Sequence, residues 1–90
     1  MLNTLETLFN LARERKVNPV DGSYTNKLLS DKTLSKSKVL EEINELIEAV
    51  EKDSNKIHEA TDVIYHLMVY LEANNIKVED VMSELKKRQK

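Results

Sequence analysis

The chain's single glycine and single proline lie in one short stretch, which limits the folds that the rest can adopt. The stretch is NPVDGSY, from Asn18 to Tyr24, where Asn-Pro and Asp-Gly each signal a turn. Glycine and proline are the residues that disfavour helix most, so the remainder of the 90 residues is free to form long helices. No segment alternates apolar and polar residues as a half-buried strand does. The pattern predicts an all-α protein.

Apolar residues recur at helical spacing in four segments, which predicts four main helices. The expected ranges are 3–16, 37–52, 56–73 and 78–87, with a short helix at 24–29. The polar stretch SDKTLSKS (30–37) is expected to be a connector, and DSN (53–55) a turn that supplies an N-cap. A tight turn between the two long central segments favours an antiparallel hairpin within a helical bundle.

Ninety residues form one domain, spanning 1–90, with a thin core. A domain of this size buries only about 60–65% of its unfolded surface. The segment 56–73 is apolar over most of its circumference, as buried helices are. A lone chain of this size leaves part of that surface uncovered, so the sequence predicts a homodimer.

Composition indicates the compartment and excludes several partners. There is no cysteine, which excludes disulfides and fits a reducing compartment. The N-terminus lacks the basic start and continuous apolar run of a signal peptide, and no stretch approaches the roughly 20 apolar residues of a membrane span. The net charge is −2, without a basic stripe. We expect a cytoplasmic protein with neither a nucleic-acid nor a membrane partner.

Two segments carry carboxylates three residues apart beside apolar stripes. Glu42 and Glu45 lie in the segment 37–52, and Glu59 and Asp62 form a narrow polar seam with His66 in the segment 56–73. Residues three apart share one face of a helix, so each pair can converge on one ligand. His66 could contact a metal ligand or be a satisfied core histidine, and the second is the favoured expectation. His58, at the start of the same segment, is expected to be exposed.

Two interpretations of these acidic pairs compete. In the first, which is the commoner one for a single glutamate, each carboxylate meets Lys or Arg from a neighbouring helix or faces solvent. In the second, the four carboxylates hold a metal, because groups this close repel one another without cations. Oxygen ligands favour Mg²⁺ or Mn²⁺ over zinc. A non-catalytic dimerisation module would explain the amphipathic helices, but not the acidic seam.

The acidic motifs resemble those of a known superfamily. EEINE (41–45) followed by EATD (59–62) resembles the EExxE…ExxD signature of the all-α, MazG-like nucleoside triphosphate pyrophosphohydrolases. Within that superfamily the chain is most similar to the phosphoribosyl-ATP pyrophosphohydrolases of histidine biosynthesis. The similar segments are ERKVNPVDGSYTNKLL (14–29), KVLEEINE (38–45), EATDVIYHLMVYL (59–71) and VEDVMSELKKR (78–88). GSYT is the most family-specific element, while Val20, Leu40 and Ile43 depart from the family pattern.

The resemblance implies hydrolysis of phosphoribosyl-ATP to phosphoribosyl-AMP and pyrophosphate. The alternative within the superfamily is a house-cleaning enzyme that acts on free nucleoside triphosphates. In either case Glu42, Glu45, Glu59 and Asp62 would hold Mg²⁺ or Mn²⁺. Glu41 and Glu42 would be catalytic, with Glu41 binding a second metal or positioning and deprotonating the water.

A nucleotide substrate also needs hydrogen-bond donors. Ser23, Tyr24 and Thr25 offer hydroxyls in the GSYT segment. Lys38 lies one turn before the paired glutamates, near the expected positive end of its helix. The remaining candidates, each of which would otherwise be a solvated surface residue, are Arg13, Arg15 and Lys27.

Overall fold

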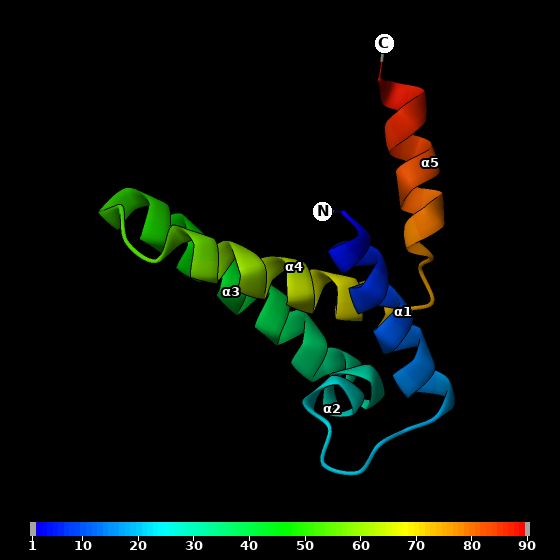
Figure 1. Ribbon diagram of the computed structural model, residues 1–90. Helices are drawn as coiled ribbons and strands as arrows, with labels where there is room; N and C mark the ends of the chain where they lie inside the picture. Colours follow the sequence, from blue (N-terminus) through cyan, green and yellow to red (C-terminus); the bar gives the residue numbers. More distant parts are fainter. Residues whose placement is uncertain (1, 90) are drawn as a thin grey trace.

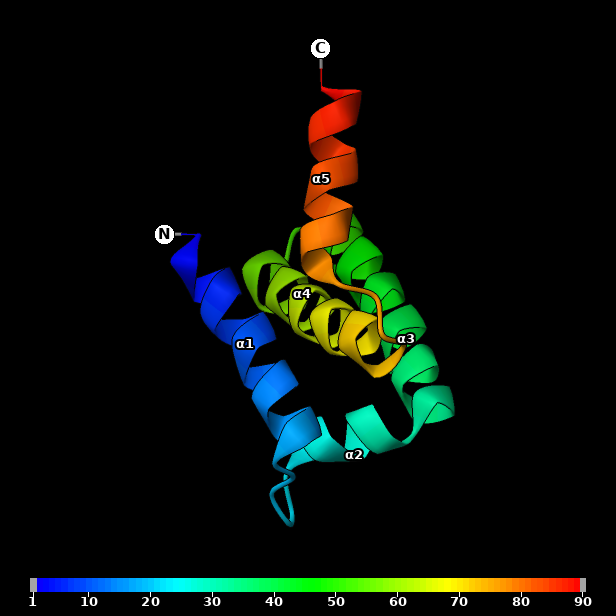
Figure 2. The same cartoon turned by 90° about the vertical axis from the view of Figure 1, so that its right-hand side faces the viewer.

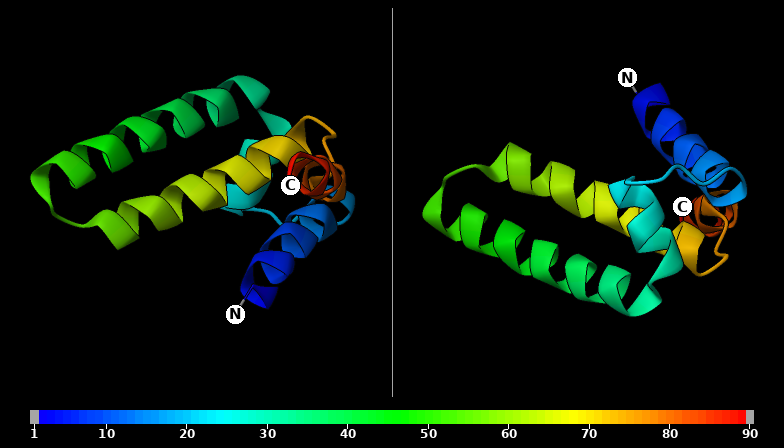
Figure 3. Two further views of the ribbon diagram at one scale, coloured as in Figure 1. Left: turned by 90° about the horizontal axis from the view of Figure 1, so that it is seen from above. Right: turned by 90° about the horizontal axis from the view of Figure 1, so that it is seen from below.

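The computed structural model describes residues 2–89, which are helical apart from short connections (Figure 1). The helices are α1 (Asn3–Val17), α2 (Tyr24–Ser30), α3 (Lys32–Lys52), α4 (Lys56–Ala73) and α5 (Val78–Arg88). α3 and α4 lie side by side as an antiparallel hairpin in both views of Figure 3. The prediction of an all-α protein is confirmed. No helix in the described range is both long enough and apolar enough to cross a membrane.

α4 is the central helix, because α1, α2 and α3 all pack against it. The core lies where α1, α2 and α4 meet. It is built on Ala12, Leu28 and Val69, and the last two have no solvent exposure. α5 extends away from the hairpin and contacts mainly α4 (Figure 2).

α3 begins five residues earlier than the sequence pattern predicts. Asp31 caps it by accepting a hydrogen bond from the N–H of Leu34 at 3.0 Å. No glycine or proline follows before position 37, so the polar residues extend the helix. The expectation of a connector over 30–37 is therefore wrong. Lys38 is consequently the seventh residue of α3, beyond the first turn where the helix dipole acts, so its expected place at the positive helix end is also wrong.

Left-handed backbone conformations form the turns. In the loop between α1 and α2, Gly22 has a φ of 78°, a conformation that glycine adopts without strain. Asp53 and Asn55 have φ values of 51° and 56° in the turn of the hairpin. Asp and Asn tolerate this region better than most residues. Asn55 takes the predicted N-cap position of α4, although its side chain makes no capping hydrogen bond.

Much apolar surface remains exposed on the α3–α4 hairpin. We refer to two sets of exposed residues, spaced three, four or seven apart, as the hairpin stripes: Leu40, Ile43, Ile47 and Val50 on α3, and Ile57, Ile64 and Leu67 on α4. The accessible surface is 6704 Å², whereas a compact monomer of this mass exposes about 5400 Å². The radius of gyration is 14.1 Å, against about 12 Å expected for 90 residues.

Candidate active site

The hairpin brings the predicted acidic residues of α3 and α4 together. One carboxylate oxygen from each of Glu42, Glu45 and Glu59 lies within 4.8 Å of the other two. Asp62 belongs to a second group of the same span, with Glu59 and His58. Because Glu59 belongs to both groups, we refer to Glu42, Glu45, Glu59 and Asp62 as the acidic cluster.

Two oxygens of the acidic cluster are buried without a partner. They are Oε2 of Glu42, a residue that is only 7% exposed, and Oε2 of Glu59. Burial, and then the neighbouring carboxylate of Glu45, raises the pKa of both side chains. Within residues 2–89 no Lys or Arg forms an ion pair with the cluster, so the cationic partners of the first interpretation are not found, while Glu45 faces solvent. Unpaired carboxylates in this arrangement fit a divalent cation with oxygen ligands.

His58 is a residue of this region that the sequence interpretation did not include among the candidate ligands. Its Nε2 lies 3.4 Å from Oδ2 of Asp62, and its side chain is exposed, as expected. The separation of four residues places both side chains on one face of α4. That spacing is the signal by which His58 could have been found.

Lys38 and Glu41 form an ion pair on α3, at the N-terminal side of the acidic cluster. Nζ of Lys38 donates to Oε2 of Glu41 at 2.7 Å. This hydrogen bond lowers the pKa of Glu41 and raises that of Lys38. Glu41 is therefore ionised at neutral pH, and its charge is balanced by Lys38.

Hydrogen bonds hold the GSYT segment against the C-terminal end of α1. Oγ of Ser23 accepts from Nη1 of Arg15 at 2.9 Å and from the N–H of Asn26 at 3.2 Å. The Asn26 side chain in turn donates to the Arg15 carbonyl at 2.7 Å and accepts from the N–H of Val20 at 2.9 Å. The structure thus brings Arg15 and Ser23 together, with Asn26 as an anchor that sequence reasoning missed.

The next two residues of the segment attach α2 to α4. The hydroxyl of Tyr24 lies 3.0 Å from Nε2 of His66, and that of Thr25 lies 2.5 Å from the hydroxyl of Tyr65. Burial raises the pKa of Tyr24, and Lys38 and both Glu41 and Glu42 are close enough to affect it as well. Tyr24 therefore lies beside the acidic cluster, whereas Thr25 is buried against α4.

Lys27 lines a cleft next to the GSYT segment. The cleft has a volume of about 660 Å³ and is also lined by Gly22, Ser23 and Tyr24. No residue of the acidic cluster lines it. Tyr24 is the residue that connects the two regions, because it borders the cleft and bonds to α4.

Arg13 lies apart from the other candidate residues. Its guanidinium donates to Glu79 at 2.6 Å and to Glu72 at 3.4 Å, and it covers the ring of Phe9. The hydrogen bond from Arg13 lowers the pKa of Glu79 to about 2. Glu72 follows Glu59 by thirteen residues, about 20 Å along α4. Arg13 therefore joins α1 to the α4–α5 junction, and the structure does not bring it to the acidic cluster.

Comparison with known proteins gives one consistent family. The sequence profile of the family described as phosphoribosyl-ATP pyrophosphohydrolase matches residues 2–89. A phosphoribosyl-ATP pyrophosphatase of Clostridium acetobutylicum is 50% identical over 90 residues, covering 93% of this chain and 79% of that protein. One from Bacillus cereus is 42% identical over 93 residues, covering 98% and 85%. A histidine biosynthesis bifunctional protein HisIE of Caldanaerobacter subterraneus is 43% identical over 94 residues, which cover 99% of this chain but 45% of that protein. The chain belongs to the phosphoribosyl-ATP pyrophosphohydrolase family.

Proposed function

We propose that this protein hydrolyses phosphoribosyl-ATP to phosphoribosyl-AMP and pyrophosphate, as a cytoplasmic enzyme of histidine biosynthesis. Its family membership and the names of its relatives support the substrate. The observation that carries the chemistry is the pair of buried, unpartnered Oε2 atoms of Glu42 and Glu59. Cleavage of a phosphoanhydride requires neutralisation of phosphate charge and an oriented water. The acidic cluster is suited to both tasks once a cation is bound.

The acidic cluster would hold Mg²⁺, with Mn²⁺ as the alternative. A bound divalent cation neutralises phosphate oxygens and lowers the pKa of a coordinated water. Glu42 would be the most rigidly placed ligand, because its side chain is buried on α3. Glu59 would connect the α3 ligands to Asp62, since it belongs to both groups of close carboxylates.

Glu41 and Lys38 would act on the water and the phosphates. While Lys38 is paired with it, the lowered pKa of Glu41 makes its carboxylate a weak base. A phosphate that draws Lys38 away would restore the basicity of Glu41 beside the reacting water. The water oxygen then bonds to the α-phosphorus as its proton passes to Glu41, the bond between the α- and β-phosphates breaks, and pyrophosphate leaves.

A substrate panel tests this function directly. The purified protein is incubated with Mg²⁺ and either phosphoribosyl-ATP, ATP or a deoxynucleoside triphosphate, and both products are quantified by chromatography. We expect kcat/KM for phosphoribosyl-ATP to exceed that for ATP by at least about a hundredfold. Equal rates on all substrates would instead indicate a general nucleotide pyrophosphohydrolase.

We further propose that two copies form a dimer through the hairpin stripes. A standard interface buries about 800 Å² per partner, and the chain exposes about 1300 Å² more than a compact monomer of its mass. The three- and four-residue spacing of the stripes is that of helices packing into a four-helix bundle. Sedimentation at low micromolar concentration should give a dimer, and a folded monomer would contradict this.

A further inference from the structure

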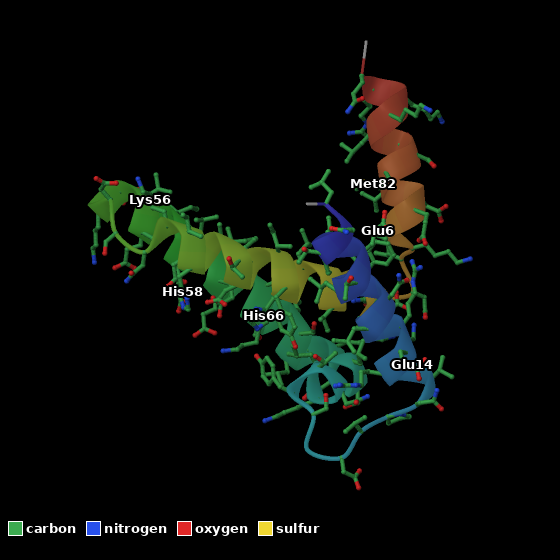
Figure 4. The ribbon with its side chains drawn as sticks, viewed as in Figure 1. Glu6, Glu14, Lys56, His58, His66 and Met82 are labelled. Carbon is green, nitrogen blue, oxygen red and sulfur yellow. The ribbon has the colours of Figure 1, made fainter. Side chains whose placement is uncertain are left out.

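His66 is a buried histidine that joins the GSYT segment to the acidic helix. It is 7% exposed, and both of its ring nitrogens have partners. Nε2 lies 3.0 Å from the Tyr24 hydroxyl, and Nδ1 lies 2.8 Å from the backbone carbonyl of Asp62. His66 points from α4 toward α2 and α3 (Figure 4). One ring therefore contacts both a residue of the family-specific segment and a residue of the acidic cluster.

The partners of His66 determine which nitrogen carries the proton. A carbonyl oxygen can only accept, so Nδ1 must be the N–H that donates to Asp62. In a neutral imidazole the other nitrogen is then bare and can only accept. With His66 neutral, the Tyr24 hydroxyl therefore donates its single proton to Nε2. Its oxygen keeps lone pairs, but it has no proton left for a further acceptor.

This assignment changes what Tyr24 can bind. Phosphate oxygens that are ionised at neutral pH are acceptors, so they cannot pair with a hydroxyl whose proton is already engaged. A sugar hydroxyl can donate, and phosphoribosyl-ATP carries several. Tyr24 lies at the right place for such a contact, because it lines the cleft beside the GSYT segment and is close to Lys38 and Glu42.

Aromatic packing holds the pair in place. The ring of Tyr65 meets that of His66 edge to face, with centroids 5.0 Å apart, and stacks on the ring of Tyr24 at 6.3 Å. The hydrogen bond between the hydroxyls of Thr25 and Tyr65 joins the same two helices as the one between Tyr24 and His66. Rotation of the imidazole would break two hydrogen bonds, so its orientation is defined by its surroundings.

We propose that His66 is a positioning residue that holds the Tyr24 hydroxyl as an acceptor for a sugar hydroxyl of the substrate. This inference rests on the proposed function for the identity of the ligand. The proton assignment itself does not depend on it. A Tyr24 that accepts from a sugar hydroxyl replaces our expectation from the sequence that this hydroxyl donates to the nucleotide substrate.

The first test reads the tautomer of His66 and needs no substrate. The protein has only two histidines, and the exposed His58 serves as the internal reference. We would record a long-range ¹H–¹⁵N correlation spectrum of the histidine rings at about pH 8, where neutral imidazole dominates. The spectrum should show a protonated Nδ1 and an unprotonated Nε2 for His66. A His66 protonated at Nε2 would overturn the proposal. This outcome is independent of whether phosphoribosyl-ATP is hydrolysed.

The second test is a double-mutant cycle between His66 and Tyr24. Loss of one neutral hydrogen bond predicts that His66→Phe and Tyr24→Phe each lower kcat/KM about threefold to tenfold, mainly through KM. Because His66 acts through Tyr24, the double variant should be no worse than the single ones. His66→Gln, whose amide can still accept from Tyr24, should recover part of the loss. Multiplied losses in the double variant would overturn the proposal.

Tyr65→Phe is the matched control for stability. It removes the adjacent hydrogen bond between α2 and α4 but leaves the His66–Tyr24 pair intact. We expect it to lower the melting temperature about as much as His66→Phe does, with a smaller change in KM. If both variants raise KM equally, His66 only fastens α2 to α4, and the positioning role is wrong. If neither wild type nor any variant acts on phosphoribosyl-ATP, the proposed function is wrong. The tautomer of His66 measured by NMR does not depend on that outcome.

Discussion

Replacing Glu42 by glutamine should stabilise the metal-free protein, although the residue is buried in the acidic cluster. Glutamine keeps the shape of the side chain and removes one negative charge. Two carboxylates about 5 Å apart repel by about 3 kcal/mol at an effective dielectric constant near 20. A buried polar atom without a partner costs about 1–3 kcal/mol. Because solvent screens part of this repulsion, we expect the free energy of unfolding at pH 7 to rise by about 1–2 kcal/mol.

The difference between variant and wild type should depend on pH. Burial and Glu45 raise the pKa of Glu42 above its ordinary 4.5. The ionised carboxylate therefore destabilises the wild type fully above the raised pKa, and this penalty disappears as the pH falls below 4.5, where folded and unfolded chains are both protonated. The advantage of Glu42→Gln should be largest at neutral pH and vanish near pH 4.

Added Mg²⁺ should reverse the order of stability. A ligand at 100 times its dissociation constant stabilises the folded state by about 2.7 kcal/mol. Wild type should gain this amount, whereas the variant lacks a ligand and should gain much less. The same reversal is expected with Mn²⁺ if the cluster binds either ion.

Chemical denaturation in EDTA and in Mg²⁺, at one fixed protein concentration, measures these differences. The fixed concentration matters because the stability of a dimer depends on it. Glu48→Gln is the control, since Glu48 is exposed and paired with Lys52 on the same helix. The Glu48→Gln variant should respond to Mg²⁺ as wild type does and should show no gain in stability at neutral pH. A Glu42→Gln variant that is less stable than wild type in EDTA at pH 7 would refute the reasoning, because the carboxylate would then be satisfied without a cation.

Four further outcomes follow from the site and the hairpin stripes. Glu59→Gln and Asp62→Asn should each lower turnover at least about a hundredfold with unchanged circular dichroism, and near-normal rates at saturating Mg²⁺ in both would contradict the metal site. Binding of Mg²⁺ at mildly acidic pH should release protons, seen as a calorimetric enthalpy that varies with the buffer, because the raised pKa of Glu42 leaves part of it protonated there. Lys38→Met should lower kcat/KM about a hundredfold but keep the stabilisation by Mg²⁺, and loss of that stabilisation would place Lys38 in a structural role. Ile47→Glu should yield monomers in sedimentation experiments, and an intact dimer would move the interface away from the hairpin stripes.

The helices of the hairpin show how far local pattern predicts this fold. α4 has the bounds that its apolar periodicity predicts, Lys56–Ala73, because apolar residues continue to both of its ends. α3 does not, since its first turns are polar and carry no period. Asp31 starts α3 at a position where the sequence pattern indicated a connector. From the sequence alone, Asp31 could be a capping residue or a loop residue. The hydrogen bond that it accepts from the Leu34 N–H identifies it as the cap.

In the candidate site, too, some features follow from local spacing and others only from packing. The three-residue spacing within each acidic pair is local, and it places the members of a pair on one face of a helix. Spacing does not determine which face turns inward or what meets it there. Packing of α3 on α4 brings Glu59 to Glu42 and Glu45 and buries two oxygens without partners.

The basic and hydroxyl residues depend still more on tertiary contacts. Arg13, Thr25 and Lys38 were all substrate-binding candidates in the sequence, yet their partners in the structure are Glu79, Tyr65 and Glu41. The sequence by itself determined the helical class, the turn between Asn18 and Tyr24, and the pairing of carboxylates along each helix, because these follow from the periodicity of neighbouring residues. Only the tertiary structure decided which side chains meet across helices, because those contacts join residues that are up to 66 positions apart and depend on how the helices pack.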